Sequence, residues 1–173
     1  MTCAVFALLL TFIATLGELL LNSFGLSLPL LGLVCFYLAV AYGFWTGAGV
    51  AVLGGASIDF LLGREHPMSI VLLLLVVALA MLWLHKLEAP SSPLLLSFPG
   101  AALPFILWVP WSLPEWEASR AWFVSFFECL AGGIVASACA AALMPLAVLA
   151  LDYFGQKLGL PLFVDAKDRL AVK

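Results

Sequence analysis

The fold is decided by one long apolar run at residues 27–62, which reads SLPLLGLVCFYLAVAYGFWTGAGVAVLGGASIDFLL. As a single helix this run would extend about 54 Å at 1.5 Å per residue, whereas the hydrocarbon core of a bilayer is about 30 Å thick. The run must therefore fold back, and Gly43, flanked by Tyr42, Phe44 and Trp45, is the expected turn. It predicts two antiparallel transmembrane helices at residues 27–42 and 45–62.

Composition extends this prediction to the whole chain. Of its residues 65% are hydrophobic and 10% are charged, against about 45–50% and about 25% in soluble globular domains. A net charge of -3 without a basic cluster argues against nucleic acid as a partner. We therefore expect an all-α integral membrane protein, with one polytopic domain at residues 1–154 and a short cytoplasmic tail at 155–173.

The remaining apolar segments predict four more helices. Runs of roughly 17–25 apolar residues are long enough to span a bilayer. Pro99 and Pro104 predict a kink in the fifth helix. The aromatic segment at residues 122–130 is left open between an interfacial and a transmembrane position. The four predicted helices cover residues 3–21, 68–84, 94–111 and 132–154.

Positive charge predicts the orientation of this six-helix arrangement. An even number of crossings puts both termini on one side, together with Lys86 and the four Lys and Arg residues from Lys157 onward. The other side holds only Arg64 and Arg120. The positive-inside rule then places both termini in the cytoplasm.

Small residues recur every fourth position along the third predicted helix and end beside a carboxylate. Such spacing lets a second helix approach closely. The last predicted helix repeats the pattern. We interpret both stripes as interfaces, for packing within the chain or for binding a partner helix. The first stripe is Gly47, Ala51, Gly55, Asp59 and Gly63, and the second is Gly132, Ala136 and Ala140.

Acidic residues within or near the spans are candidates for function, because an intramembrane charge is costly. Asp59 has three readings: a hydrogen bond that closes the neighbouring loop, a partner contact or polar ligand cavity, or a proton relay. Glu18, Asp59 and Glu128 would form an acidic pocket if they converged. The sequence holds no HExxH, P-loop, nucleophile-elbow or Rossmann motif. We expect no metal, no cofactor and no enzymatic activity.

Two stretches resemble the MreD family, the membrane subunit of the bacterial cell-elongation machinery. Residues 53–63, LGGASIDFLLG, are similar to that family's glycine-rich helix closing on an acid and a glycine loop. Residues 144–154, MPLAVLALDYF, followed by QKLGLPLF at 156–163, are similar to its proline-bearing last helix and short tail. The recognisable pattern covers about thirty residues of the chain.

The resemblance implies a six-helix fold like that of the substrate-binding subunits of energy-coupling-factor transporters. It also implies a non-catalytic scaffold for rod shape and lateral peptidoglycan synthesis. The implied partners are the lipid bilayer and an MreC-like protein, with RodA, a class B penicillin-binding protein and MreB in the wider complex. The alternative is a solute-binding transporter subunit, although Ala4, Ala7 and Ala14 lack the Ala-x-x-x-Ala spacing expected for docking its coupling subunit.

Overall fold

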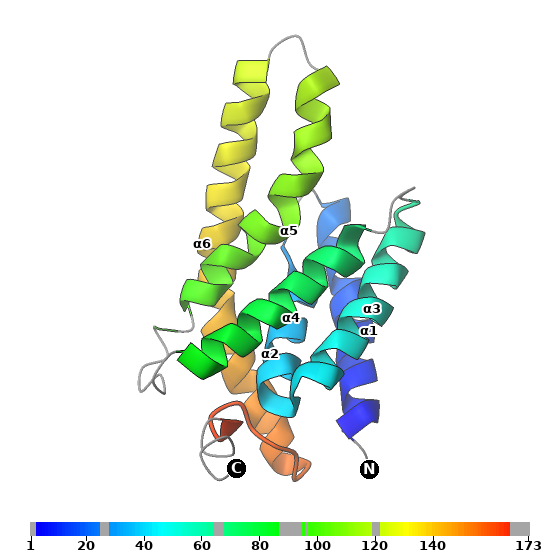
Figure 1. Cartoon of the computed structure of the whole chain (residues 1–173), viewed down its shortest axis with the longest axis vertical. Coiled ribbons are helices and arrows are strands. Elements are labelled where there is room, and N and C mark those ends of the chain that lie inside the picture. The colour runs from blue at the N-terminus through cyan, green and yellow to red at the C-terminus, as the bar shows by residue number, and fades with distance from the viewer. Residues whose placement is uncertain are drawn as a thin grey trace.

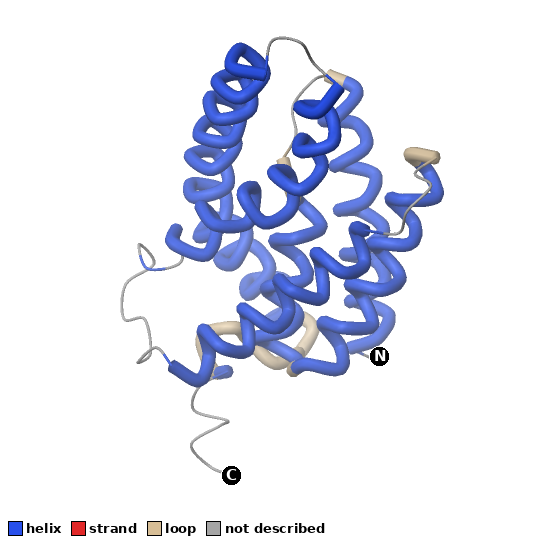
Figure 2. Tube along the Cα trace, turned by 45° about the horizontal axis from the view of Figure 1, so that its top comes forward, coloured by secondary structure: helices blue, strands red, loops and turns tan. Residues whose placement is uncertain are grey.

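The described part of the chain is all-helical, as predicted. The computed structural model describes residues 3–24, 28–63, 68–86, 95, 97–118 and 122–166. The side chains of residue 86 and of residues 108–118, 122–126, 128 and 129 lie outside that description. Within these limits there is no strand (Figure 2). The helices are α1 (Cys3–Ser23), α2 (Leu30–Tyr42), α3 (Phe44–Leu61), α4 (Met68–Lys86), α5 (Ser97–Ala118) and α6 (Trp122–Lys157).

The helices are arranged as a four-helix group, α1–α4, beside a long α5–α6 hairpin (Figure 1). The chain runs up α1, down α2, up α3 and down α4, and then rises along α5 and returns along α6. The upper part of the hairpin extends beyond the other four helices, and α5 changes direction near its middle. The start of α1 and the end of α6 lie at the same end of the bundle.

The centre of the fold is α2, the shortest helix. Its side chains are buried from Leu31 to Ala41 with the exception of Val34, which is half-buried. It packs against α1, α3, α4, α5 and α6. A helix that is apolar all round belongs in a core, which explains why the sequence there shows no polar face.

The outer surface is apolar around this centre. Large exposed side chains such as Phe12 on α1, Phe60 on α3, Val71 on α4 and Leu146 on α6 point away from the core. Within the described residues, four helices are long and apolar enough to cross a membrane: Cys3–Ser23, Phe44–Leu61, Met68–His85 and the Leu130–Lys157 part of α6. Exposed apolar patches larger than a few hundred Å² are rare in soluble monomers, so this surface is compatible with a membrane protein.

Three features differ from the sequence prediction: the bounds of two helices and the position of the tail. The last helix is continuous over Trp122–Lys157, so residues 122–130 form its first turns rather than a separate segment. The fifth helix runs to Ala118 rather than ending at residue 111, because α5 continues to pair along α6 beyond its apolar run. The tail is also not free, because Phe163 and Ala166 are buried against the bundle.

Candidate functional site

The small-residue stripe on α3 lies inside the molecule. Gly47, Ala51, Gly55 and Asp59 are all buried, and only Gly63, at the end of the helix, is exposed. A Cβ on Gly47 would lie 2.7 Å from Ala39 Cβ on α2. A Cβ on Gly55 would lie 2.9 Å from both Cα and N of Ile70 on α4. The stripe therefore packs α3 between its two neighbours along the chain.

The turn between α2 and α3 makes this packing compact. Gly43 is the single residue between the two helices and has φ +97°. Its N–H donates to the carbonyl of Ala39, which satisfies one of the carbonyls left open at the end of α2. A residue with a side chain rarely adopts this φ, so the reversal depends on glycine at this position.

Asp59 caps the next helix. Its side chain is 4% exposed, and its Oδ2 accepts a hydrogen bond of 3.1 Å from the backbone N–H of Ser69, the second residue of α4. The first four N–H groups of a helix have no partner within the helix, and a negative charge there is favoured by the helix dipole. The carboxylate therefore ties the end of α3 to the start of α4.

Glu18 does the same for α2. Pro29 precedes that helix and offers no side-chain cap. Glu18 Oε2, from α1, instead accepts a hydrogen bond of 2.9 Å from the N–H of Leu31. In both α1–α2 and α3–α4, an acid near the end of the rising helix caps the second residue of the descending helix. The sequence pattern did not show that Glu18 and Asp59 have the same role, because the residues around them in the sequence differ.

Replacement of Glu18 by alanine tests this cap. We expect Glu18→Ala to lower the free energy of unfolding by about 0.5–2 kcal/mol, the range for loss of a helix N-cap. Glu18→Gln keeps an acceptor oxygen at the same place and should lose less. Thermal melting of the helical circular-dichroism signal in detergent measures both, and equal midpoints for wild type and Glu18→Ala would argue against the cap.

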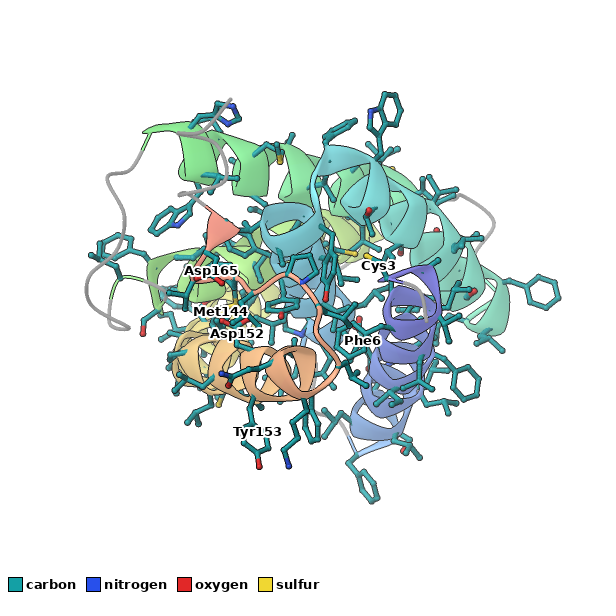
Figure 3. The ribbon with its side chains drawn as sticks, turned by 90° about the horizontal axis from the view of Figure 1, so that it is seen from below. Cys3, Phe6, Met144, Asp152, Tyr153 and Asp165 are labelled. Atoms are coloured by element: carbon teal, nitrogen blue, oxygen red, sulfur yellow. The ribbon has the colours of Figure 1, made fainter. Side chains whose placement is uncertain are left out.

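Asp152 on α6 is a third carboxylate that holds elements together, and sequence reasoning gave it no role. Its Oδ1 accepts hydrogen bonds from the Tyr37 hydroxyl and the Phe163 N–H, both at 2.8 Å, and its Oδ2 accepts one from the Val164 N–H at 3.4 Å. The labelled Asp152 lies where the returning tail crosses the lower end of the bundle (Figure 3). One side chain thus joins α6, α2 and the tail.

The second small-residue stripe faces α5 in part. Ala136 and Ala140 are buried, whereas Gly132 is exposed. A Cβ on Gly100 of α5 would lie 2.7 Å from the carbonyl oxygen of Ala140. Close helix approach through small residues therefore builds the α5–α6 hairpin as well as the α2–α3–α4 packing.

The acids of the candidate polar pocket have separate partners. Glu18 bonds to α2 and Asp59 bonds to α4, while the side chain of Glu128 lies outside the described residues. Among the described residues, no three His, Cys, Asp or Glu side chains are grouped to hold a metal ion. A groove of about 250 Å³ does lie between α4 and α5, with Phe36 of α2 in its wall, but its lining is almost wholly apolar.

Comparisons of the chain with protein families, curated proteins and solved structures give no match. Glu18, Asp59 and Asp152 each accept a hydrogen bond from a backbone N–H of another segment, which is the behaviour of a structural cap.

Proposed function

We propose that the chain is a non-catalytic membrane scaffold subunit of the bacterial cell-elongation complex, of the MreD type. Its role would be to support rod shape and lateral peptidoglycan synthesis. It would bind an MreC-like membrane protein, and through it RodA, a class B penicillin-binding protein and MreB. The resemblance of residues 53–63 and 144–163 to the MreD family is the basis for naming this complex.

The observation that carries the scaffold interpretation is how the buried and half-buried acids are used. Glu18, Asp59 and Asp152 are engaged by backbone N–H groups, so each contributes to joining helices. Two of them, Asp59 and Asp152, fall within the stretches that resemble the family. A bundle whose helices are joined in this way, with an apolar outer surface, suits a protein that works by holding partners in place.

We further infer that all six helices cross the bacterial inner membrane, with both termini in the cytoplasm. The 13 residues of α2 extend only about 20 Å at 1.5 Å per residue. Because α2 is enclosed by the other helices, its ends do not have to meet lipid. The start of α1 and the end of α6 at one end of the bundle support an even number of crossings.

A solute-binding subunit of an energy-coupling-factor-type transporter is the second candidate. Ligand pockets generally combine apolar walls with a few placed polar groups. The groove between α4 and α5 offers the walls, and among the described residues that line it only Trp83 carries a polar side-chain atom. This lining fits a polar vitamin-like solute less well than it fits an apolar chain, so we place the transporter function second.

Depletion of the protein in the bacterium that encodes it tests the proposal. We expect rods to become rounded within a few generations, as lateral wall synthesis loses its orientation. Re-expression of the wild-type chain should restore rods. Cells that keep their length-to-width ratio without the protein would contradict a role in elongation, and a growth defect rescued by one added vitamin would favour the transporter.

A further inference from the structure

The bundle is divided into two packed units. Contacts are extensive within α1–α4 and within α5–α6, but those of α5 and α6 with α2 and α4 are sparse. The apolar groove lies at this division: Val76, Leu79 and Trp83 form its α4 wall, Leu103 and Ile106 belong to its α5 wall, and Phe36 of α2 also lines it. The two units therefore meet across a partly empty seam.

The C-terminal segment is turned back toward this seam by the end of α6. Gly159 has φ +65°, its N–H donates to Gln156 O at 3.2 Å, and the N–H of Leu160 donates to Gly155 O at 2.9 Å. This pair of bonds is a Schellman motif, which ends a helix and reverses the chain, and glycine is favoured where φ is positive. Residues 160–166 consequently return over the lower end of the bundle (Figures 1 and 3).

The returning segment binds both units at once. On α6, the carboxylate of Asp152 accepts hydrogen bonds from the N–H groups of Phe163 and Val164. On α2, the Phe163 ring stacks on Tyr37, with centroids 6.0 Å apart and planes 14° from parallel, and on Phe36 at 6.4 Å and 28°. The Tyr37 hydroxyl donates to the same carboxylate.

Phe36 connects this attachment to the groove. Its ring is 2% exposed, stacks on Phe163 and also lines the groove between α4 and α5. Removal of Phe163 would leave Phe36 without a neighbour on one side. Because packed side chains have few alternative positions, a shift of Phe36 would change the groove wall.

We propose that residues 160–166 are a latch that holds the α5–α6 hairpin against α1–α4, and that release of Phe163 from Tyr37 and Asp152 opens the groove. The hairpin moves as one unit because α5 and α6 are locked together at Gly100 and Ala140. The seam opens at the groove between α4 and α5, where the packing of the two units is already incomplete.

Distance measurement by double electron–electron resonance tests the latch. Spin labels are placed at Leu75→Cys on α4 and Phe105→Cys on α5, two exposed positions outside the groove lining. The sequence has four cysteines, of which Cys3, Cys129 and Cys139 are replaced by serine, and the fully buried Cys35 is kept. In phosphatidylethanolamine–phosphatidylglycerol nanodiscs, Phe163→Ala and Asp152→Ala should give a longer mean distance and a wider distribution than the parent.

Three further variants set the scale of the response. Val164→Ala alters a side chain that is 73% exposed in the same segment and should leave the distribution unchanged. Tyr37→Phe removes only the hydroxyl that bonds Asp152, keeps the aromatic stack, and should give an intermediate shift. A chain ending at Gly159 lacks the latch and should match Phe163→Ala.

The outcomes are distinct. A distribution that stays as in the parent in Phe163→Ala, Asp152→Ala and the shortened chain would overturn the latch. Loss of monodisperse protein in all three variants would also overturn it, because the segment would then be part of the core. Separation of the labels in these variants, with Val164→Ala unchanged, supports the proposal.

Discussion

Gly55→Leu is expected to destabilise the folded chain far more than the same substitution at Gly49 on the same helix. A Cβ at this position would lie 2.9 Å from two backbone atoms of Ile70, and backbone cannot move aside as a flexible side chain can. Overpacking of a filled interior generally costs about 1–3 kcal/mol, and we expect the upper end of that range or more. Midpoints of thermal unfolding in detergent, and the yield of monodisperse protein, measure the effect.

Gly49→Leu is the matched control for this prediction. Gly49 lies on the same helix, is exposed, and has nothing within 4 Å of the position of an added Cβ. Its substitution should leave stability unchanged or slightly raise it, since leucine is a better helix former than glycine. Equal losses in the two variants would mean that α3 and α4 do not meet at Gly55.

Asp59→Leu is expected to have the second largest effect on the stability of the fold. The substitution removes the acceptor of the Ser69 N–H and leaves that donor without its 3.1 Å bond in a buried site. Removing one partner of a buried hydrogen bond costs about 1–3 kcal/mol. For a chain of this size the unfolding midpoint should fall by about 2–12 °C.

Asp59→Asn separates capping from charge. Asparagine is as good a helix cap as aspartate, so this variant should keep most of the stability lost in Asp59→Leu. It should also keep partner binding if Asp59 serves the fold. A stable Asp59→Asn protein that fails to restore rods after depletion, where the wild type restores them, would point instead to a functional charge at this position.

Much of the architecture could be predicted from residues 27–62. The excess length of that run required a reversal, and glycine among aromatics located it at Gly43, where the chain turns with a single residue between helices. The spacing of Gly47, Ala51 and Gly55 indicated close helix approach, because two helix backbones come close together where the side chains between them are small or absent. Periodicity did not show which helices would fill those faces, since α2 is apolar on every side.

The parts that could not be predicted depend on contacts between distant segments. Asp152 is hydrogen-bonded to Tyr37, 115 positions away in the sequence. A local sequence pattern cannot indicate a contact between residues so far apart. The tail has the length and charge of a free cytoplasmic extension, yet Phe163 is buried on α2. Its one local signal was Gly159, which suits the end of a helix that reverses the chain.

Co-purification with the MreC-like protein of the same bacterium tests the proposed scaffold function most directly. The two chains are co-expressed, solubilised in mild detergent and recovered through a tag on the chain described here, with Asp59→Asn as a folded variant beside the wild type. We expect the MreC-like protein to co-elute with both in a fixed ratio that survives size-exclusion chromatography. Recovery of a folded, monodisperse chain without the MreC-like protein, or with a bound small solute in its place, would contradict the proposal.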